Sequence, residues 1–258
     1  MKKLVALLVI VAAFLMTSTD TKAQNFFIKI GGGYALGNST SLLNVSGDSG
    51  TTTGNYGSYG EGITPALSLG YTFNPYIGIE VGGTYLLGKK HEFTRTFGTI
   101  TSTEKQYGSG ILITPSIFVQ APMKNMTPYA RFGGVIGLVK VKTETTQSGT
   151  GASTGTDIDE YSGKMGLGMN GAFGIKFKAG KMLDIFAELF GTSMNYGPEK
   201  RENTETYSGG TLDPTVTYEE EYSSTATNTS LTPRLPFSNF GLNVGVVLTF
   251  GKAPKTKK

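Results

Sequence analysis

Few side chains in this sequence have the types and spacing that catalysis requires. The one histidine, His91, is followed by Glu92. A Ser–His–acid triad on these two residues would need a serine from elsewhere, and the local motifs typical of such hydrolases are not evident. One histidine cannot build a multi-histidine metal site. The chain has no cysteine, so disulfides and thiolate sites are excluded. We therefore predict no enzyme activity, no catalytic residue, no metal site and no cofactor.

Two short motifs also point away from ligand chemistry. The run Glu219–Glu221 offers oxygens to a hard cation, but its spacing matches no calcium loop. Neighbouring strand residues point to opposite faces, so a solvated charge run is favoured. Gly31–Gly33 lies in a strand-like run with no helix after it, and is therefore not a nucleotide-binding loop.

The strongest pattern is a regular series of eight apolar stretches. Each is long enough for a bilayer-spanning strand of about 9–11 residues. They lie near 26–37, 62–73, 77–87, 109–121, 128–140, 164–178, 183–196 and 237–250. The connections alternate between short turns at 74–76, 123–127 and 180–182 and long polar loops at 38–61, 88–108, 141–163 and 197–236.

This asymmetry is typical of bacterial outer-membrane barrels. It predicts an all-β fold, an eight-stranded antiparallel up-and-down transmembrane β-barrel with long extracellular loops and short periplasmic turns. A hairpin within 197–236 would make the number of strands ten. The polar loops are expected to be either mobile or partly ordered as hairpin extensions.

The first residues read as a secretory leader. Lys2 and Lys3 precede the apolar run Leu4–Met16, and Thr17–Ala23 is polar and ends in a small residue. We predict a signal peptide over 1–23 that is cleaved near Ala23; an uncut membrane anchor is the alternative. The barrel then spans 24–250, a basic periplasmic tail spans 251–258, and the protein is expected in the cell outer membrane.

Bulk composition agrees with strands rather than helices in a membrane. Hydrophobic residues make up 38% of the chain, below the roughly 45–50% of soluble domains, which excludes a helical membrane protein. The formal charge of +4 gives no basis for nucleic-acid binding. The 37 glycines, many inside strand-like runs, suit a narrow barrel in which side chains compete for interior space.

Alternation within the strands separates a lipid face from a lumen face. Leu67–Phe73, Ile77–Gly82 and Phe240–Val246 place apolar residues at every second position. The polar residues on the inward phase are Lys29, Glu80, Arg131, Asn170, Lys176, Asp184, Glu188 and Asn243. A charge facing lipid near the midplane would cost roughly 2–4 kcal/mol, which favours the inward assignment.

Opposite charges on the inward phase can pair near the short-turn ends of the strands. We predict a lumen ionic network built from Lys29, Glu80, Arg131, Lys176 and Glu188. A plug that fixes the core is the favoured interpretation; a gate or proton-sensitive constriction is the alternative. Aromatic girdles are also predicted, with Tyr71, Phe73, Tyr76, Tyr129 and Phe250 at the periplasmic interface and Tyr34, Tyr85, Tyr196 and Phe237 at the outer one.

Three segments carry a resemblance to a known family. They are Pro128–Gly134 after a short turn, Leu183–Glu188 with an inward glutamate, and Phe240–Phe250 with a terminal aromatic. On these, the chain resembles the small bacterial outer-membrane β-barrel family, porin-like and of the outer-membrane protein A and outer-membrane protein W type. The leader ending Lys22–Gln24 is similar to leaders from Bacteroidota. One departure is that Gly251–Lys258 follows the closing aromatic.

The pattern and the resemblance leave two functions open. The favoured one is a structural or surface-interaction barrel with a largely side-chain-filled lumen and functional outer loops. The alternative is a porin-like passive conduit for small or apolar solutes. The expected partners are outer-membrane lipid and lipopolysaccharide, the barrel-assembly machinery during biogenesis, and surface ligands through loop 197–236; no nucleic acid is expected.

Overall fold

A computed structural model describes residues 25–39, 41–48, 51–221 and 228–250. Regular structure in these residues consists of β-strands. No helix among them has the length and apolar character needed to span a membrane. The predicted leader 1–23 and basic tail 251–258 lie outside the described residues.

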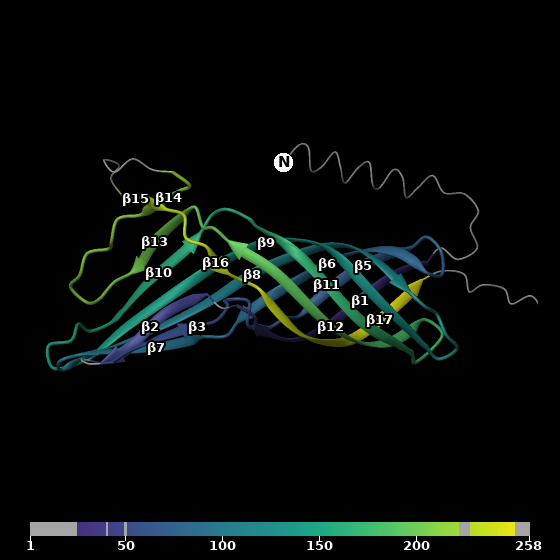
Figure 1. Ribbon diagram of the computed structural model, residues 1–258, viewed down its shortest axis with the longest axis horizontal. Helices are drawn as coiled ribbons and strands as arrows, with labels where there is room; N and C mark the ends of the chain where they lie inside the picture. The colour runs from purple at the N-terminus through teal and green to yellow at the C-terminus, as the bar shows by residue number, and fades with distance from the viewer. Residues whose placement is uncertain (1–24, 40, 49–50, 222–227, 251–258) are drawn as a thin grey trace, which may run out of the picture.

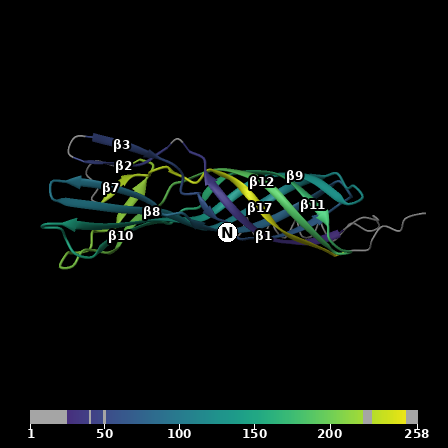
Figure 2. The same cartoon turned by 90° about the horizontal axis from the view of Figure 1, so that it is seen from below.

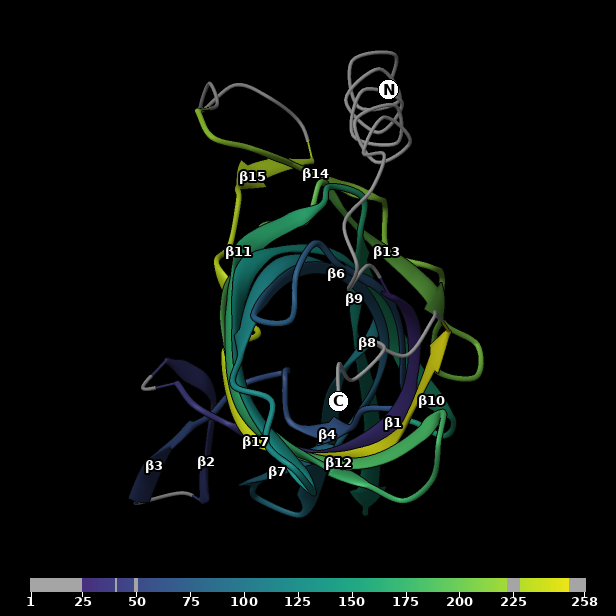
Figure 3. The ribbon, with the colours of Figure 1, turned by 90° about the vertical axis from the view of Figure 1, so that its right-hand side faces the viewer.

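Eight strands form a closed ring (Figures 1 and 3). In ring order they are β1 (Asn25–Gly37), β5 (Ala66–Thr72), β6 (Ile77–Gly88), β8 (Ile100–Gln120), β9 (Met126–Gly149), β11 (Gly166–Lys178), β12 (Leu183–Tyr196) and β17 (Asn239–Phe250). Each neighbouring pair is antiparallel. β17 closes the ring on β1, with a register that runs from Phe26–Phe250 to Gly37–Asn239. The short β4 (Gly62–Ile63) continues β5 between β1 and β6. The all-β prediction is confirmed, with an eight-strand ring.

The two ends of the ring differ as the connections predict. At one end, here called the short-turn end, the strands are joined by 73–76, 121–125 and 179–182. At the other, the long-loop end, the connections form a strand-rich extension that makes the molecule elongated (Figures 1 and 2). Its strands are β2 (Leu42–Asp48), β3 (Thr51–Tyr56), β7 (His91–Phe97), β10 (Thr156–Ser162), β13 (Lys200–Glu205), β14 (Val216–Glu219), β15 (Thr229–Leu231) and β16 (Leu235–Pro236).

The extension grows from two ring strands that continue past the others. β8 has 21 residues and β9 has 24; at about 3.3 Å per residue, β9 is roughly 80 Å long. β7 and β10 pair with these continued ends, and β13 pairs with β10. Of the described strands in 197–236, β13 to β15 join the extension, and the two-residue β16 pairs with the end of the ring strand β12. They do not add a pair to the ring.

The lumen holds two apolar layers. Phe27, Phe118, Phe186 and Val247 form the layer nearer the short-turn end. The larger layer nearer the long-loop end consists of Tyr59, Leu86, Leu112, Val135, Val139, Val141, Met194, Tyr196 and Phe237. Tyr59 comes from a loop, and its backbone N–H donates to the Pro236 carbonyl at 2.8 Å. This loop therefore folds into the lumen and helps close it.

Interior aromatic rings lie over glycines of the neighbouring strand. Phe27 is paired with Gly70, Phe118 with Gly78, Tyr129 with Gly174 and Phe186 with Gly245. A Cβ at any of these glycines would overlap the ring that covers it. An eight-stranded ring is only wide enough for its own side chains. Glycine therefore supplies the space that each aromatic ring occupies.

The Gly70→Ala variant tests this packing. We expect a loss of about 1–3 kcal/mol in the free energy of unfolding, because Phe27 must leave its position. The measurement is urea unfolding in lipid vesicles, followed by circular dichroism because the chain has no tryptophan. Gly83→Ala is the matched control, since the nearest atom to its Cβ is the Leu67 oxygen at 3.8 Å. Equal stability of the two variants would contradict the account.

Candidate functional site

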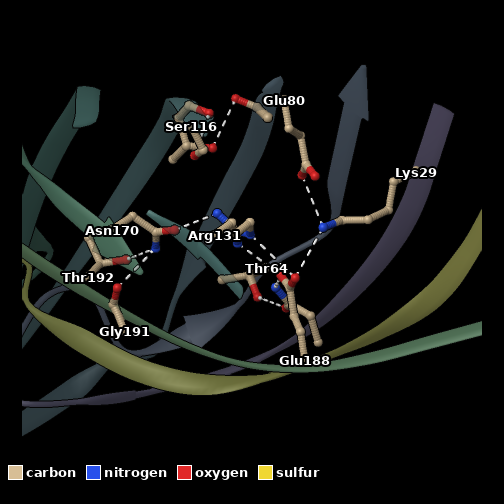
Figure 4. A network of polar contacts seen from close by, with 12 residues as sticks. Lys29, Thr64, Glu80, Ser116, Arg131, Asn170, Glu188, Gly191 and Thr192 are labelled. Atoms are coloured by element: carbon tan, nitrogen blue, oxygen red, sulfur yellow. Dashed lines mark hydrogen bonds and ion pairs between the residues drawn. The ribbon is translucent and has the colours of Figure 1, made fainter. Parts of the chain in front are cut away.

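Four charged side chains meet between the two apolar layers (Figure 4). Lys29 Nζ lies 3.0 Å from Glu80 Oε1 and 3.1 Å from Glu188 Oε2. Arg131 Nη2 lies 2.9 Å from Glu188 Oε1. The four side chains are at most 9% exposed. Two cations and two carboxylates therefore balance in a site that is nearly closed to solvent; we call this cluster the lumen plug.

Glu188 is the centre of the lumen plug. Besides its two cations, it accepts hydrogen bonds from Tyr129 Oη at 2.8 Å and Asn243 Nδ2 at 3.3 Å. Arg131 makes a second contact to it through Nε at 3.3 Å. These donors come from β1, β9 and β17, while Glu188 is on β12. A buried carboxylate is costly unless it is paired and hydrogen-bonded, and this one is both.

Polar side chains extend the lumen plug across the ring. Arg131 Nη1 donates to Asn170 Oδ1. Asn170 Nδ2 in turn donates to Thr192 Oγ1 at 2.9 Å and to the Gly191 carbonyl at 3.1 Å (Figure 4). The guanidinium is thereby held from two sides, which fixes its position in the lumen.

Lys176, the fifth residue of the predicted network, lies apart from the other four. Its ammonium donates to Gln120 Oε1 and makes no ion pair within the described residues. The Tyr129 ring is near both lysines, Lys29 and Lys176, with each Nζ 5.5 Å from the ring centroid. The Phe27 and Phe118 rings are 5.8 and 5.9 Å from Lys176 Nζ. Inward orientation alone did not reveal this separation, because it depends on depth along the barrel.

Little space remains around the lumen plug. A cavity of about 20 Å³ adjoins Lys29, Arg131 and Glu188. Another of about 10 Å³ is lined by Lys29, Glu80, Tyr129 and Lys176. A water molecule needs roughly 10–15 Å³ of such volume, so each cavity has room for about one water.

The aromatic girdle prediction is wrong for three residues. Tyr129, Tyr196 and Phe237 are 8%, 0% and 1% exposed and lie in the lumen. Residues an even number of positions apart lie on the same face of a strand. Tyr129 therefore shares the inward face of Arg131, and Tyr196 that of Glu188, so the alternation already indicated that both side chains point into the lumen. Phe237 lies between β16 and β17, where the alternation does not apply. By contrast, Tyr34 and Tyr85 are exposed at the long-loop end, as are Phe73, Tyr76 and Phe250 at the short-turn end.

The surroundings of His91 do not form the triad considered from sequence. The nearest carboxylate is Glu61, at 3.9 Å from Nε2, whereas Glu92 pairs with Lys105 at 3.4 Å. Nε2 makes no hydrogen bond within the described part of the chain. Burial lowers the pKa of His91, against an opposing effect of Glu61. The Ser58 backbone also hydrogen-bonds the imidazole, but the Ser58 hydroxyl donates to the Pro236 carbonyl at 3.1 Å.

The glutamate run at the long-loop end also lacks the geometry of a metal site. Glu220 pairs with Arg234 at 3.1 Å, and both side chains are about two-thirds exposed. Across the residues that the structure describes, no three His, Cys, Asp or Glu side chains gather closely enough to hold a metal ion.

The chain matches no family model. It also matches no curated protein. Its structural neighbours are outer-membrane β-barrel proteins. Neisserial surface protein A is 12% identical, with a TM-score of 0.39 and coverage of 87% of this chain and 97% of that one.

Two further neighbours have similarly low identity. Ail, the attachment invasion locus protein of Yersinia pestis, solved with the heparin analogue sucrose octasulfate, is 11% identical, with a TM-score of 0.39 and coverage of 88% and 99%. E. coli outer membrane protein W is 14% identical, with a TM-score of 0.35 and coverage of 90% and 100%. At these values the likeness carries no inference about a ligand or an activity.

The charge balance of the lumen plug makes a testable prediction. Glu188→Gln leaves one carboxylate for two buried cations and should lower the free energy of unfolding by about 3–5 kcal/mol. The double variant Glu188→Gln/Arg131→Met keeps the balanced Lys29–Glu80 pair. It should therefore be more stable than the single variant, as measured by urea unfolding in vesicles.

The exposed Glu220–Arg234 pair supplies the control. Glu220→Gln should change the free energy of unfolding by no more than about 1 kcal/mol, because surface ion pairs contribute little. A double variant less stable than Glu188→Gln would show that charge balance does not govern the plug.

Proposed function

We propose that this chain is an integral outer-membrane barrel whose lumen is sealed and whose function lies at its long-loop end. In this proposal the ring strands run up and down across the bilayer. The observation that carries it is an inverted distribution of side chains. Large apolar residues cover the outside of the ring, while Lys29, Glu80 and Glu188 are buried inside it.

The outer surface of the ring supports a lipid environment. Leu167, Phe173, Phe132 and Ile117 are 70%, 75%, 63% and 63% exposed and come from three neighbouring strands. Soluble monomers rarely expose contiguous apolar surface of this kind. On β9 the outward series ends at Lys140, which is exposed and pairs with Glu160. The outward apolar series of β9 runs from Met126 to Leu138, which is close to the length that a tilted strand needs.

Topology supports the orientation in this proposal. Short turns face the periplasm in bacterial barrels and long loops face outward. The short-turn end would thus be periplasmic, and the strand-rich extension would stand outside the cell. The sequence-predicted leader agrees with export.

The filled lumen favours a structural or surface-interaction role over a passive conduit. A solute would have to displace the apolar layer around Phe27, the lumen plug and the apolar layer around Tyr196. The extension remains as the surface that a partner can reach. We propose that the 197–236 part of the extension contacts surface ligands. We also propose that the part of the extension next to the ring contacts outer-membrane lipid and lipopolysaccharide.

A planar-bilayer recording tests the sealed lumen. Refolded mature protein, checked by its gel shift on boiling, should show no steady single-channel current. Glu80→Ala/Arg131→Ala should also stay silent, because the apolar layers remain and Lys29 and Glu188 still balance each other. Steady conductance of the wild type would favour the porin-like conduit instead.

Replacement of 200–231 by a short Gly/Ser linker tests the surface role. We expect unchanged barrel assembly, measured by gel shift, and loss of adhesion of expressing cells to host-cell surfaces. Leu235 and Phe237 are retained because they pack in the lumen with Tyr196. Replacement of the β2–β3 hairpin at 44–55, which keeps Leu43 on the same apolar layer, is the control and should retain adhesion. Failure to assemble after the 200–231 replacement would contradict the separation of barrel and surface.

A further inference from the structure

A larger cavity lies at the short-turn end, beyond the lumen plug. It has a volume of about 510 Å³ and opens where the turns of β5, β8 and β11 meet the ring interior. We call it the vestibule. Small-molecule sites usually measure about 300–1,000 Å³. The vestibule is therefore large enough for a ligand, whereas the cavities beside the lumen plug are not.

The charged side chains around the vestibule are mostly cationic. Lys176, Lys178 and Lys181 line it, and among the residues that the structure describes Asp184 is the one lining carboxylate. Lys178 and Lys181 are exposed at the rim, while Lys176 lies deeper. None of these lysines makes an ion pair among the described residues. Three lysines against one carboxylate give the described lining of the vestibule an excess of positive charge.

Lys176 lines the vestibule and also the cavity of about 10 Å³ that Lys29, Glu80 and Tyr129 line. Its ammonium has one hydrogen-bond acceptor, Gln120 Oε1, and three aromatic rings around it. An ammonium has three N–H donors, so two remain for a ligand. Low-dielectric walls focus the field of such a group toward the opening.

The remaining vestibule wall combines apolar and hydroxyl groups. Phe27, Pro75, Pro122 and Met182 offer apolar surface, and Thr127 offers a hydroxyl. Lysine binds phosphate as a point charge, whereas the fork of an arginine best matches a planar carboxylate, and no arginine is among the described residues of this wall. A neutral ligand would leave the lysines unpaired, and a cation would be repelled by them.

We propose that the vestibule binds a small organic phosphate, with the phosphoryl group on Lys176 and the apolar body against Phe27 and Met182. Lys178 and Lys181 attract the anion at the rim. This inference rests on the proposed function in one respect, the compartment from which the ligand comes. In the proposed orientation the vestibule opens to the periplasm. The site itself is independent of the sealed lumen.

Isothermal titration of the refolded mature protein with 4-nitrophenyl phosphate tests the proposal. We expect saturable binding of one ligand per chain at low ionic strength, and no saturable binding of neutral 4-nitrophenol. Lys176→Met should weaken binding about tenfold or more, because a hydrogen bond to a charged group is lost. Asp184→Asn should tighten binding, since the one opposing charge is removed.

Two controls keep the result interpretable. Lys140→Met makes the same substitution at the other end of the ring and should leave the affinity unchanged. Lys181→Ala changes an exposed rim residue, should not disturb folding, and should weaken binding several-fold even if Lys176→Met does not fold.

The phosphate site would be overturned if Lys176→Met and Lys181→Ala bound with the affinity of the wild type. It would also be overturned if folded wild type did not bind. Tighter binding of 4-nitrobenzoate than of 4-nitrophenyl phosphate would also overturn it in favour of a carboxylate. These outcomes are distinct from failure of the proposed function, which would appear as conductance or as lack of membrane insertion.

Discussion

The buried carboxylate of Glu188 is the interaction on which the interior depends. Burial of an ion in a narrow lumen is costly, so its surroundings must supply every missing contact. Lys29, Arg131, Tyr129 and Asn243 do so from three other strands. Because these donors are spread around the ring, their convergence also fixes how the strands are staggered. A one-residue slip of any of them would direct the donor to the outer face of the ring.

Space is the second constraint, and glycine meets it. Each aromatic ring near Glu188 occupies the volume that a side chain of the neighbouring strand would otherwise take, as Phe186 does over Gly245 and Tyr129 over Gly174. Tyr129 serves both constraints, since its hydroxyl binds Glu188 while its ring covers Gly174. Stabilisation of the Glu188 charge and packing against Gly174 therefore depend on the same residue. A substitution of Tyr129 would affect both.

The alternation of residues predicts the ring strands and their inward faces well. It predicts the inward direction of Lys29, Glu80, Arg131 and Glu188, and the structure brings these four into contact. It does not give depth, so it could not separate Lys176 from them. It also fails outside regular strands, and for this reason Tyr59 and Phe237, which enter the lumen from connecting segments, escaped prediction. The order of the extension arises from pairing with the continued β8 and β9, which a polar Ser/Thr-rich sequence does not reveal.

The same layer of side chains that closes the lumen also holds the extension in place. Tyr59, Tyr196 and Phe237 pack together, with ring centroids 5.9 Å apart for both pairs that involve Phe237. These residues lie at the base of the segments that carry the β2–β3 hairpin and the strands β13 to β15. Packing in the upper lumen thus anchors surface segments that contain few apolar residues of their own. An extension built in this way gains rigidity from the side chains that fill the ring, and a ring without them would lose that support. In this chain the same side chains therefore fill the upper lumen and hold the extension in position.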